Sequence, residues 1–107
     1  MINIKLVLTD HWFEEIKSGR KTHEYRKATP FWYKRLLPAI RITNLKNNDF
    51  NVERPVVYFQ KAYRKNPERM IFEVQNITIK GGENTDLSCV EDVFDIELGR
   101  RIGWLTQ

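Results

Sequence analysis

Hydrophobic residues alternate with polar ones at the start of the chain and then recur at helical spacing. In residues 2–8 every second position is apolar, which predicts a strand with one buried face. These positions are Ile2, Ile4, Leu6 and Leu8. Trp12, Phe13 and Ile16 then form one apolar stripe, so residues 9–19 are predicted to be a short helix.

Two prolines and a cluster of polar residues mark the next segments. Residues 21–28 contain a threonine and a tyrosine that favour a strand. Pro30 occupies a helix-start position and Pro38 would end the helix, so a short amphipathic helix is expected over residues 29–38. Residues 42–54 are rich in Asn and Asp and are expected to form a loop.

The second half of the chain has the pattern of three strands. Residues 55–62 are β-branched and aromatic, and residues 70–82 make the longest strand candidate. In this long segment the apolar positions change parity, which predicts a bulge near Gln75 and Asn76. Residues 93–105 form the last predicted strand.

Five or six short strands with two early helices indicate an α+β fold with a curved sheet or small barrel. A chain of 107 residues supports one core, so we expect a single domain over residues 1–107. No apolar run approaches the roughly 20 residues that span a membrane. Cys89 is the only cysteine, which leaves no internal disulfide and no cysteine-based zinc site. We therefore expect a cytoplasmic protein that uses no membrane, metal or cofactor.

The charge of the chain favours an anionic partner. The formal net charge is +4 and the isoelectric point is about 9.3, which is basic for so short a chain. Nucleic acid is the most common partner of such a chain, although the arrangement of the charges matters more than their sum.

Ionisable side chains are concentrated in residues 19–26. If this segment is a strand, Glu24 and Arg26 project from one face and can form a hydrogen-bonded ion pair. Glu73 is a second anomaly, because a carboxylate inside an apolar strand needs a cation as partner. Lys21 or Arg26 is the expected partner of Glu73.

Residues 12–26, WFEEIKSGRKTHEYR, resemble the signature of the ASCH domain family within the wider PUA-like group. That signature is a helix with an aromatic residue and an isoleucine, followed by Gly-x-Lys-x-x-Glu-x-Arg. Residues 69–79 and 94–102 resemble later strands of the family, so the resemblance spans nearly the whole chain. The motif stands complete here as Gly19, Lys21, Glu24 and Arg26.

This resemblance implies a PUA-like small β-barrel with two short flanking helices and a cleft that binds RNA or a nucleotide-like ligand. The implied cleft residues are Lys21, Glu24, Arg26 and Glu73. One branch of the family removes the acetyl group from acetylated cytidine, and its matching positions are a Lys at 21, a Thr at 24 and a Glu at 73. This chain keeps Lys21 and Glu73 but has Glu24 in place of the hydroxyl, with Thr22 as a substitute nucleophile.

A second basic cluster surrounds an aromatic residue in the turn at residues 61–69. Cations that contact phosphates and a ring that stacks on a base suit single-stranded RNA, although a solvated basic loop has the same composition. The predicted nucleic-acid rim consists of Lys61, Tyr63, Arg64, Lys65, Lys34 and Arg35.

Simpler roles are expected for several other residues. Arg20 and His23 are predicted to face solvent, and His11 and His23 are too isolated to make a metal site. Trp12 and Phe13 are assigned to the core.

Three functions follow for the charged cleft. The first is an ASCH domain that binds RNA or a nucleotide, which requires only that cations grip oxygens. The second is an amidohydrolase acting on acetylated cytidine or a similar nucleoside, with Lys21, Glu24 and Glu73 as its catalytic residues. The third is a protein-interaction module in which the cleft is purely structural. No oligomeric state is predicted.

Overall fold

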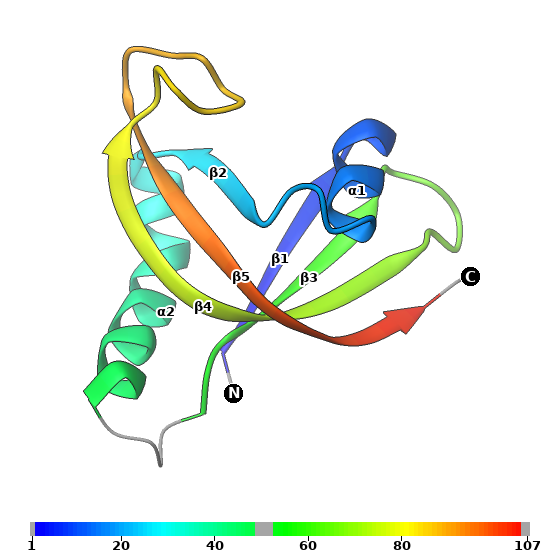
Figure 1. Ribbon diagram of the computed structural model, residues 1–107, viewed down its shortest axis with the longest axis horizontal. Coiled ribbons are helices and arrows are strands. Elements are labelled where there is room, and N and C mark those ends of the chain that lie inside the picture. The colour runs from blue at the N-terminus through cyan, green and yellow to red at the C-terminus, as the bar shows by residue number, and fades with distance from the viewer. Residues whose placement is uncertain (1, 49–52, 106–107) are drawn as a thin grey trace.

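The computed structural model describes residues 2–48 and 53–105, in which five strands form one curled sheet beside two helices (Figure 1). The strand order is β1-β3-β4-β5-β2. Only β1 and β3 are parallel, and the other three neighbouring pairs are antiparallel. The bounds are β1 (Asn3–Leu8), β2 (His23–Lys27), β3 (Val56–Lys61), β4 (Arg69–Gly81) and β5 (Asp92–Leu105).

The predicted α+β class with a curved sheet is confirmed, but the barrel is not closed. The sheet curls into a half-barrel whose end strands are β1 and β2. Within the described residues, each of these two strands pairs on one side only. An open seam therefore lies between them.

The hydrophobic core fills the inside of the curl. Alternation along β1 buries every second side chain, as its sequence pattern predicted, because those residues face the helices. Neighbouring strands continue the layer in register, with Leu6 opposite Phe59 and Phe59 opposite Met70. The core residues include Ile4, Leu6, Leu8, Phe13, Ile16, Leu36, Ala39, Val57, Phe59, Met70, Val74, Ile77, Phe94 and Ile96.

Helix α1 (Asp10–Lys17) forms as its apolar stripe predicted. Thr9 precedes it in an extended conformation, and Phe13 and Ile16 are both buried. Gly19 follows with φ of 85°, a left-handed conformation that glycine adopts without strain. The chain turns there toward β2.

Helix α2 (Pro30–Asn48) is longer than predicted, because it continues through Pro38. Pro38 lacks an N–H and is exposed, so the helix loses one internal hydrogen bond but no packing. Buried residues on the opposite side, such as Leu36, Ala39 and Thr43, hold the helix against the sheet. The prediction of a loop over residues 42–54 is thus wrong for 42–48, while 49–52 lie outside the described residues.

The predicted bulge in β4 is confirmed. Val74 pairs with Leu98 and Asn76 pairs with Glu97, so Gln75 is an extra residue on β4. The β4–β5 hairpin bends strongly along its length (Figure 1), and such bulges increase the bend and twist of a strand. The bend brings the far half of the hairpin, with β2 attached, round toward β1.

Candidate functional site

The motif residues of β2 face the inside of the half-barrel. In the register of β2 and β5, Glu24 lies opposite Ile96 and Arg26 lies opposite Phe94, both of which are buried. Arg26 reaches across the seam, where its Nη2 donates to the carbonyl oxygen of Val7 at 3.4 Å. Two charged side chains therefore lie where the core opens at the seam.

Glu24 binds two cations and is itself almost fully buried, with 4% of its surface exposed. Its Oε1 lies 2.9 Å from Nζ of Lys21, and its Oε2 lies 3.1 Å from Nη2 of Arg26. The predicted Glu24–Arg26 ion pair is confirmed. Lys21 precedes β2, so strand alternation does not determine its direction, and its side chain joins Glu24. Each carboxylate oxygen of Glu24 thus has one cation partner, which makes it a positioning residue for both.

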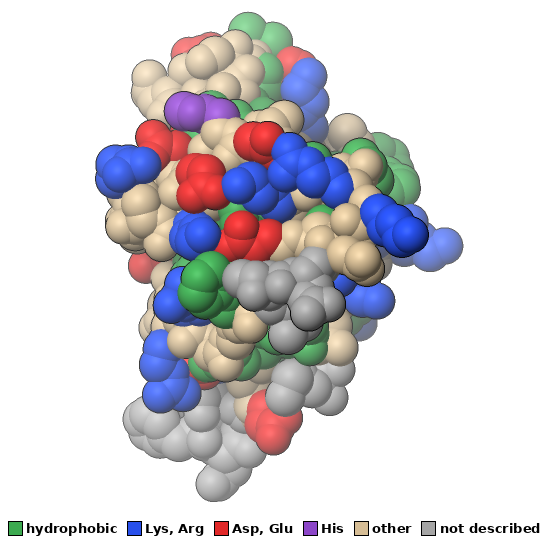
Figure 2. Space-filling model, turned by 90° about the vertical axis from the view of Figure 1, so that its right-hand side faces the viewer, with side chains coloured by type: hydrophobic (Ala, Val, Ile, Leu, Met, Phe, Trp, Pro, Cys, Tyr) green, Lys and Arg blue, Asp and Glu red, His purple; other side chains and the backbone are tan. Residues whose placement is uncertain are grey.

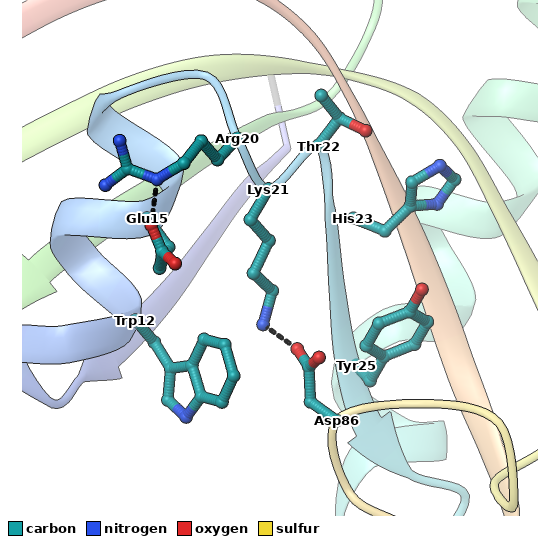
Figure 3. A pocket seen from close by; sticks show the side chains of 8 residues that line it. All are labelled: Trp12, Glu15, Arg20, Lys21, Thr22, His23, Tyr25 and Asp86. Carbon is teal, nitrogen blue, oxygen red and sulfur yellow. Dashed lines mark hydrogen bonds and ion pairs between the residues drawn. The ribbon is translucent and has the colours of Figure 1, made fainter.

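Aromatic rings lie beside both cations, and Figure 3 shows those beside Lys21. Nζ of Lys21 lies 4.3 Å from the ring centroid of Trp12 and 5.7 Å from that of Tyr25. The guanidinium of Arg26 lies 5.4 Å from the ring centroid of Trp32, at the start of α2. These are cation–π distances. Trp12 does pack against the core as predicted, but it also forms a wall of the site.

Asp86, in the loop between β4 and β5, forms an ion pair with Lys21 (Figure 3). This pair lies where two hollows of the site meet, since both residues line both hollows. The larger hollow has a volume of about 330 Å³ and the smaller about 140 Å³. The larger is also lined by Glu15, Arg20, Thr22 and His23, and the smaller by Val7, Leu8, Thr9, Glu24, Arg26 and Leu87. Both share Trp12, Lys21, Tyr25 and Asp86.

Sequence reasoning missed Asp86 as part of the site. It lies 65 residues from Lys21, in a loop whose only signal was its turn-forming composition. An acidic residue in such a loop is ordinary, so no local pattern pointed to a contact with the motif.

His23 and Tyr25 form a second polar layer beside Lys21. Nδ1 of His23 lies 2.6 Å from Oδ1 of Asp95, which is 7% exposed and also pairs with Lys80 at 3.4 Å. His23 is therefore half-buried and held in place, rather than simply facing solvent as predicted. Burial, followed by the negative charge of Asp95, raises the pKa of Tyr25. Arg20 is exposed as predicted and pairs with Glu15.

Glu73 does not join the other motif residues. Its Oε1 accepts a hydrogen bond from Nε of Arg100 at 3.1 Å, so the predicted pairing with Lys21 or Arg26 is wrong. The β2 residue Glu24 lies opposite Ile96, which pairs with Ile77 on β4. Ile77 and Glu73 are four positions apart on β4, about 13 Å of strand.

The predicted nucleic-acid rim is split between two sides of the molecule. Lys34 and Arg35 lie on α2, whereas the turn at residues 61–69 lies beside α1 (Figure 1). Tyr63 is 89% exposed, and Lys65 is exposed as well. The structure does not bring these two groups together.

The turn at residues 61–69 is also balanced by acidic residues. Nζ of Lys61 lies 2.5 Å from Oε1 of Glu14, and this hydrogen bond raises the pKa of Lys61. Arg64 forms an ion pair with Asp10. Lys and Arg side chains are interspersed with Asp and Glu side chains on this face (Figure 2). The face is therefore not a continuous basic patch.

Comparisons with known proteins gave no match. A scan against models of protein families, a search of curated proteins and a search of solved structures each found nothing similar. Among residues 2–48 and 53–105, no group of three or more His, Cys, Asp or Glu side chains could hold a metal ion. Neither helix in this part of the chain is long and apolar enough to cross a membrane.

Proposed function

We propose that the seam site binds a nucleobase-containing ligand, either RNA or a nucleotide. The observation that supports this is the Lys21–Glu24–Arg26 cluster, which holds two cations beside aromatic rings at the mouth of a hollow. Aromatic faces can stack on any base, and Lys and Arg donate to phosphate or carbonyl oxygens. The best ligand for such a site is planar and carries anionic or carbonyl oxygens.

Arg26 has a hydrogen-bond donor that could bind an oxygen of the ligand. Its Nε is buried and has no hydrogen-bond partner among the described residues, and its side chain lines the smaller hollow. A buried donor without a partner costs about 1–3 kcal/mol. A ligand oxygen that accepts from this atom would recover part of that cost.

We further propose that the chain is a PUA-like ASCH domain. The support is the motif from Gly19 to Arg26, now found at the seam of a curled sheet with a helix on either side of the motif in the sequence. The role that the resemblance implies for Glu73 has no support in the geometry, because that residue pairs with Arg100.

Ligand titrations followed by tryptophan fluorescence test nucleotide binding, since Trp12 and Trp32 lie beside the cations. Uridine monophosphate and short single-stranded RNA should both bind at low salt, and their affinity should fall as salt rises. Lys21→Met should weaken binding at least about tenfold, because it removes a charge-assisted contact. Lys27→Met, an exposed lysine paired only at 3.8 Å with Glu91, is the matched control. If wild-type protein bound neither probe at low salt, the proposal would be rejected.

A hydrolase acting on acylated nucleosides is the second candidate. The specific observation in its favour is that Thr22 lines the larger hollow together with Lys21 and His23. His23 is oriented by the buried Asp95, the arrangement of a general base. His23 would take the proton from the Thr22 hydroxyl, the threonine oxygen would attack the acyl carbon, and the amine would leave with that proton. His23 would then take a proton from a water that attacks the acyl-Thr22 ester, and the carboxylic acid would leave as the proton returns to the Thr22 oxygen. Lys21 would stabilise the oxyanion.

Incubation with acetylated cytidine, with cytidine release as the readout, tests this second candidate. Thr22→Val and His23→Asn should each abolish release, whereas Thr78→Val, an exposed threonine on β4, should not. No release by the wild-type protein would remove the hydrolase. If nucleotides also failed to bind, the remaining interpretation would be a protein-interaction module.

A further inference from the structure

The positive charges of the residues in α2 are equal in number to the net charge of the whole chain. The chain has 18 Lys and Arg residues and 14 Asp and Glu residues. Within Pro30–Asn48 there is no acidic residue. Its four cations, which equal the chain's net charge of +4, are Lys34, Arg35, Arg41 and Lys46.

Three of these cations, Lys34, Arg35 and Arg41, are exposed side chains of α2, and no carboxylate among the described residues pairs with them. Lys34 and Arg41 are two helical turns apart, so they lie on the same side, and both are exposed. No ion pair among the described residues involves α2, whereas cations on the face of α1 are paired with carboxylates. Exposed Phe31 stacks with Arg35, whose guanidinium lies 3.6 Å from its ring centroid. This surface is complementary to a polyanion.

A hollow of about 230 Å³ lies between α2 and β1, on the other side of Trp32 from the seam site. It is formed by Asn3, Ile4 and Lys5 of β1 together with Trp32 and Arg35 of α2. Trp32 is also the ring that faces Arg26, so it separates this hollow from the seam.

The two hollows follow one another along β1. Lys5 lines the hollow beside α2, and Val7 lines the smaller hollow of the seam site. These residues are about 7 Å apart along the strand, a span that one nucleotide of an extended strand covers.

We propose that the ligand is a single-stranded polynucleotide rather than a mononucleotide. One nucleotide occupies the seam site, the neighbouring phosphate lies between Lys5 and Arg35, and the strand continues past Lys34 and Arg41. This inference rests on the proposed nucleotide binding. It adds a phosphate subsite and a direction for the strand, from the seam onto α2.

A polynucleotide fits this surface better than an anionic membrane does. Leu36 and Ala39 are buried against the sheet and cannot enter lipid, whereas the apolar residues that α2 leaves exposed include two aromatic rings, Phe31 and Tyr33, besides Leu37 and Leu45. Aromatic rings beside Lys34 and Arg35 suit the bases and phosphates of a single strand. The surface also adjoins the seam site at Trp32, which lines the hollow beside α2 and faces Arg26, and aromatic rings in the seam site suit a base.

The test compares uridine monophosphate with a short single-stranded oligouridylate. Wild-type protein should bind the oligonucleotide much more tightly than the mononucleotide. The double variant Lys5→Gln, Arg35→Gln should lose roughly tenfold in oligonucleotide affinity, and the slope of log K against log salt should fall by about 1.4, as expected for two phosphate contacts with a single strand. Its affinity for the mononucleotide should stay unchanged.

The control is the double variant Arg100→Gln, Arg101→Gln, which removes the same charge from two exposed residues of β5. It should keep the wild-type affinity for the oligonucleotide. Circular dichroism checks that both variants are folded.

Several results would overturn the inference. One is equal affinity of the wild-type protein for the two probes, and another is an equal loss of oligonucleotide affinity in both double variants. Binding to phosphatidylserine vesicles without binding to the oligonucleotide would replace the polynucleotide by a membrane. Failure of the mononucleotide and the oligonucleotide alike would instead reject the proposed nucleotide binding itself.

Discussion

Glu24 stabilises the folded structure of the seam, because its buried carboxylate neutralises both Lys21 and Arg26. Glu24→Gln should lower the free energy of unfolding by about 3 kcal/mol, since removing one partner of a buried ion pair leaves the other charges uncompensated. Urea denaturation measures this change.

Glu91→Gln is the matched control for Glu24→Gln. Glu91 pairs with Lys27 at 3.8 Å, and both side chains are about half exposed. Loss of such a surface pair should cost less than about 1 kcal/mol. Equal losses in the two variants would contradict the structural role of Glu24.

Tyr25 should make the protein sensitive to alkaline pH. Burial and the charge of Asp95 raise its pKa above the ordinary value of 10.0. As pH passes about 10, the unfolded chain ionises this tyrosine first. The stability that its neutral form contributes is complete below pH 10 and is lost as pH rises through the folded pKa.

Tyr25→Phe should therefore show a smaller loss of stability above pH 10 than the wild-type protein. In an alkaline titration followed by phenolate absorbance, Tyr25→Phe should lack the component that ionises at the highest pH in the wild-type protein. Tyr63→Phe, which changes an 89% exposed ring, serves as the control. An unchanged alkaline profile in Tyr25→Phe would refute the prediction.

At the scale of elements, α2 contains an exposed proline in its interior, Pro38, where a residue with a backbone N–H would fit the helix better. Pro38→Ala restores the N–H that can donate to the carbonyl of Lys34, so it should stabilise the protein by about 1–2 kcal/mol. Thermal unfolding measures the effect. Leu37→Ala, on the same exposed side, should change stability by less than about 0.5 kcal/mol. A lower melting temperature for Pro38→Ala would mean that the packing of α2 depends on the ring.

Features formed by residues close together in the sequence were predicted correctly, whereas features that depend on residues far apart in the sequence were not. Alternation in β1, the stripe of α1 and the bulge near Gln75 are local patterns, and each predicted the observed element. The Glu24–Arg26 pair was predictable because its members are two residues apart on one strand.

Features that depend on tertiary contacts were missed. The continuation of α2 through Pro38 results from packing against the sheet, which outweighs the local signal to stop. Asp86 comes close to Lys21 through the bent β4–β5 hairpin. Glu73 lies about 13 Å along β4 from the residue level with Glu24, which the sequence alone did not show.

At the scale of the whole molecule, Glu68, which directly precedes β4, connects α1 with β5 at the side opposite α2. Its Oε2 lies 2.8 Å from Nζ of Lys17 on α1 and accepts from Nε1 of Trp104 on β5 at 2.6 Å. Mainly through the hydrogen bond from Lys17, these donors lower the pKa of Glu68 below its ordinary value of 4.5. The stability that it contributes is complete above pH 4.5 and is lost as pH falls toward the lower, folded pKa.

Glu68→Gln should consequently be less stable than the wild-type protein at neutral pH and should lose less stability on acidification. Urea unfolding at neutral and acid pH measures both effects. Glu83→Gln, an exposed carboxylate without an ion pair among the described residues, should follow the wild-type profile. Parallel acid profiles for all three proteins would contradict the role of Glu68.

The open seam has a consequence for self-association. Strands β1 and β2 each present an edge that could accept a strand from another molecule, as sheet edges do in aggregation and domain swapping. Arg26 donates to the carbonyl oxygen of Val7 on the edge of β1. This carbonyl is therefore less available to a strand of another molecule, so Arg26 opposes intermolecular pairing. Arg26→Ala should show concentration-dependent assembly in sedimentation experiments, while Lys27→Ala should remain like the wild-type protein. A ligand that fills the seam would then also keep the molecules apart.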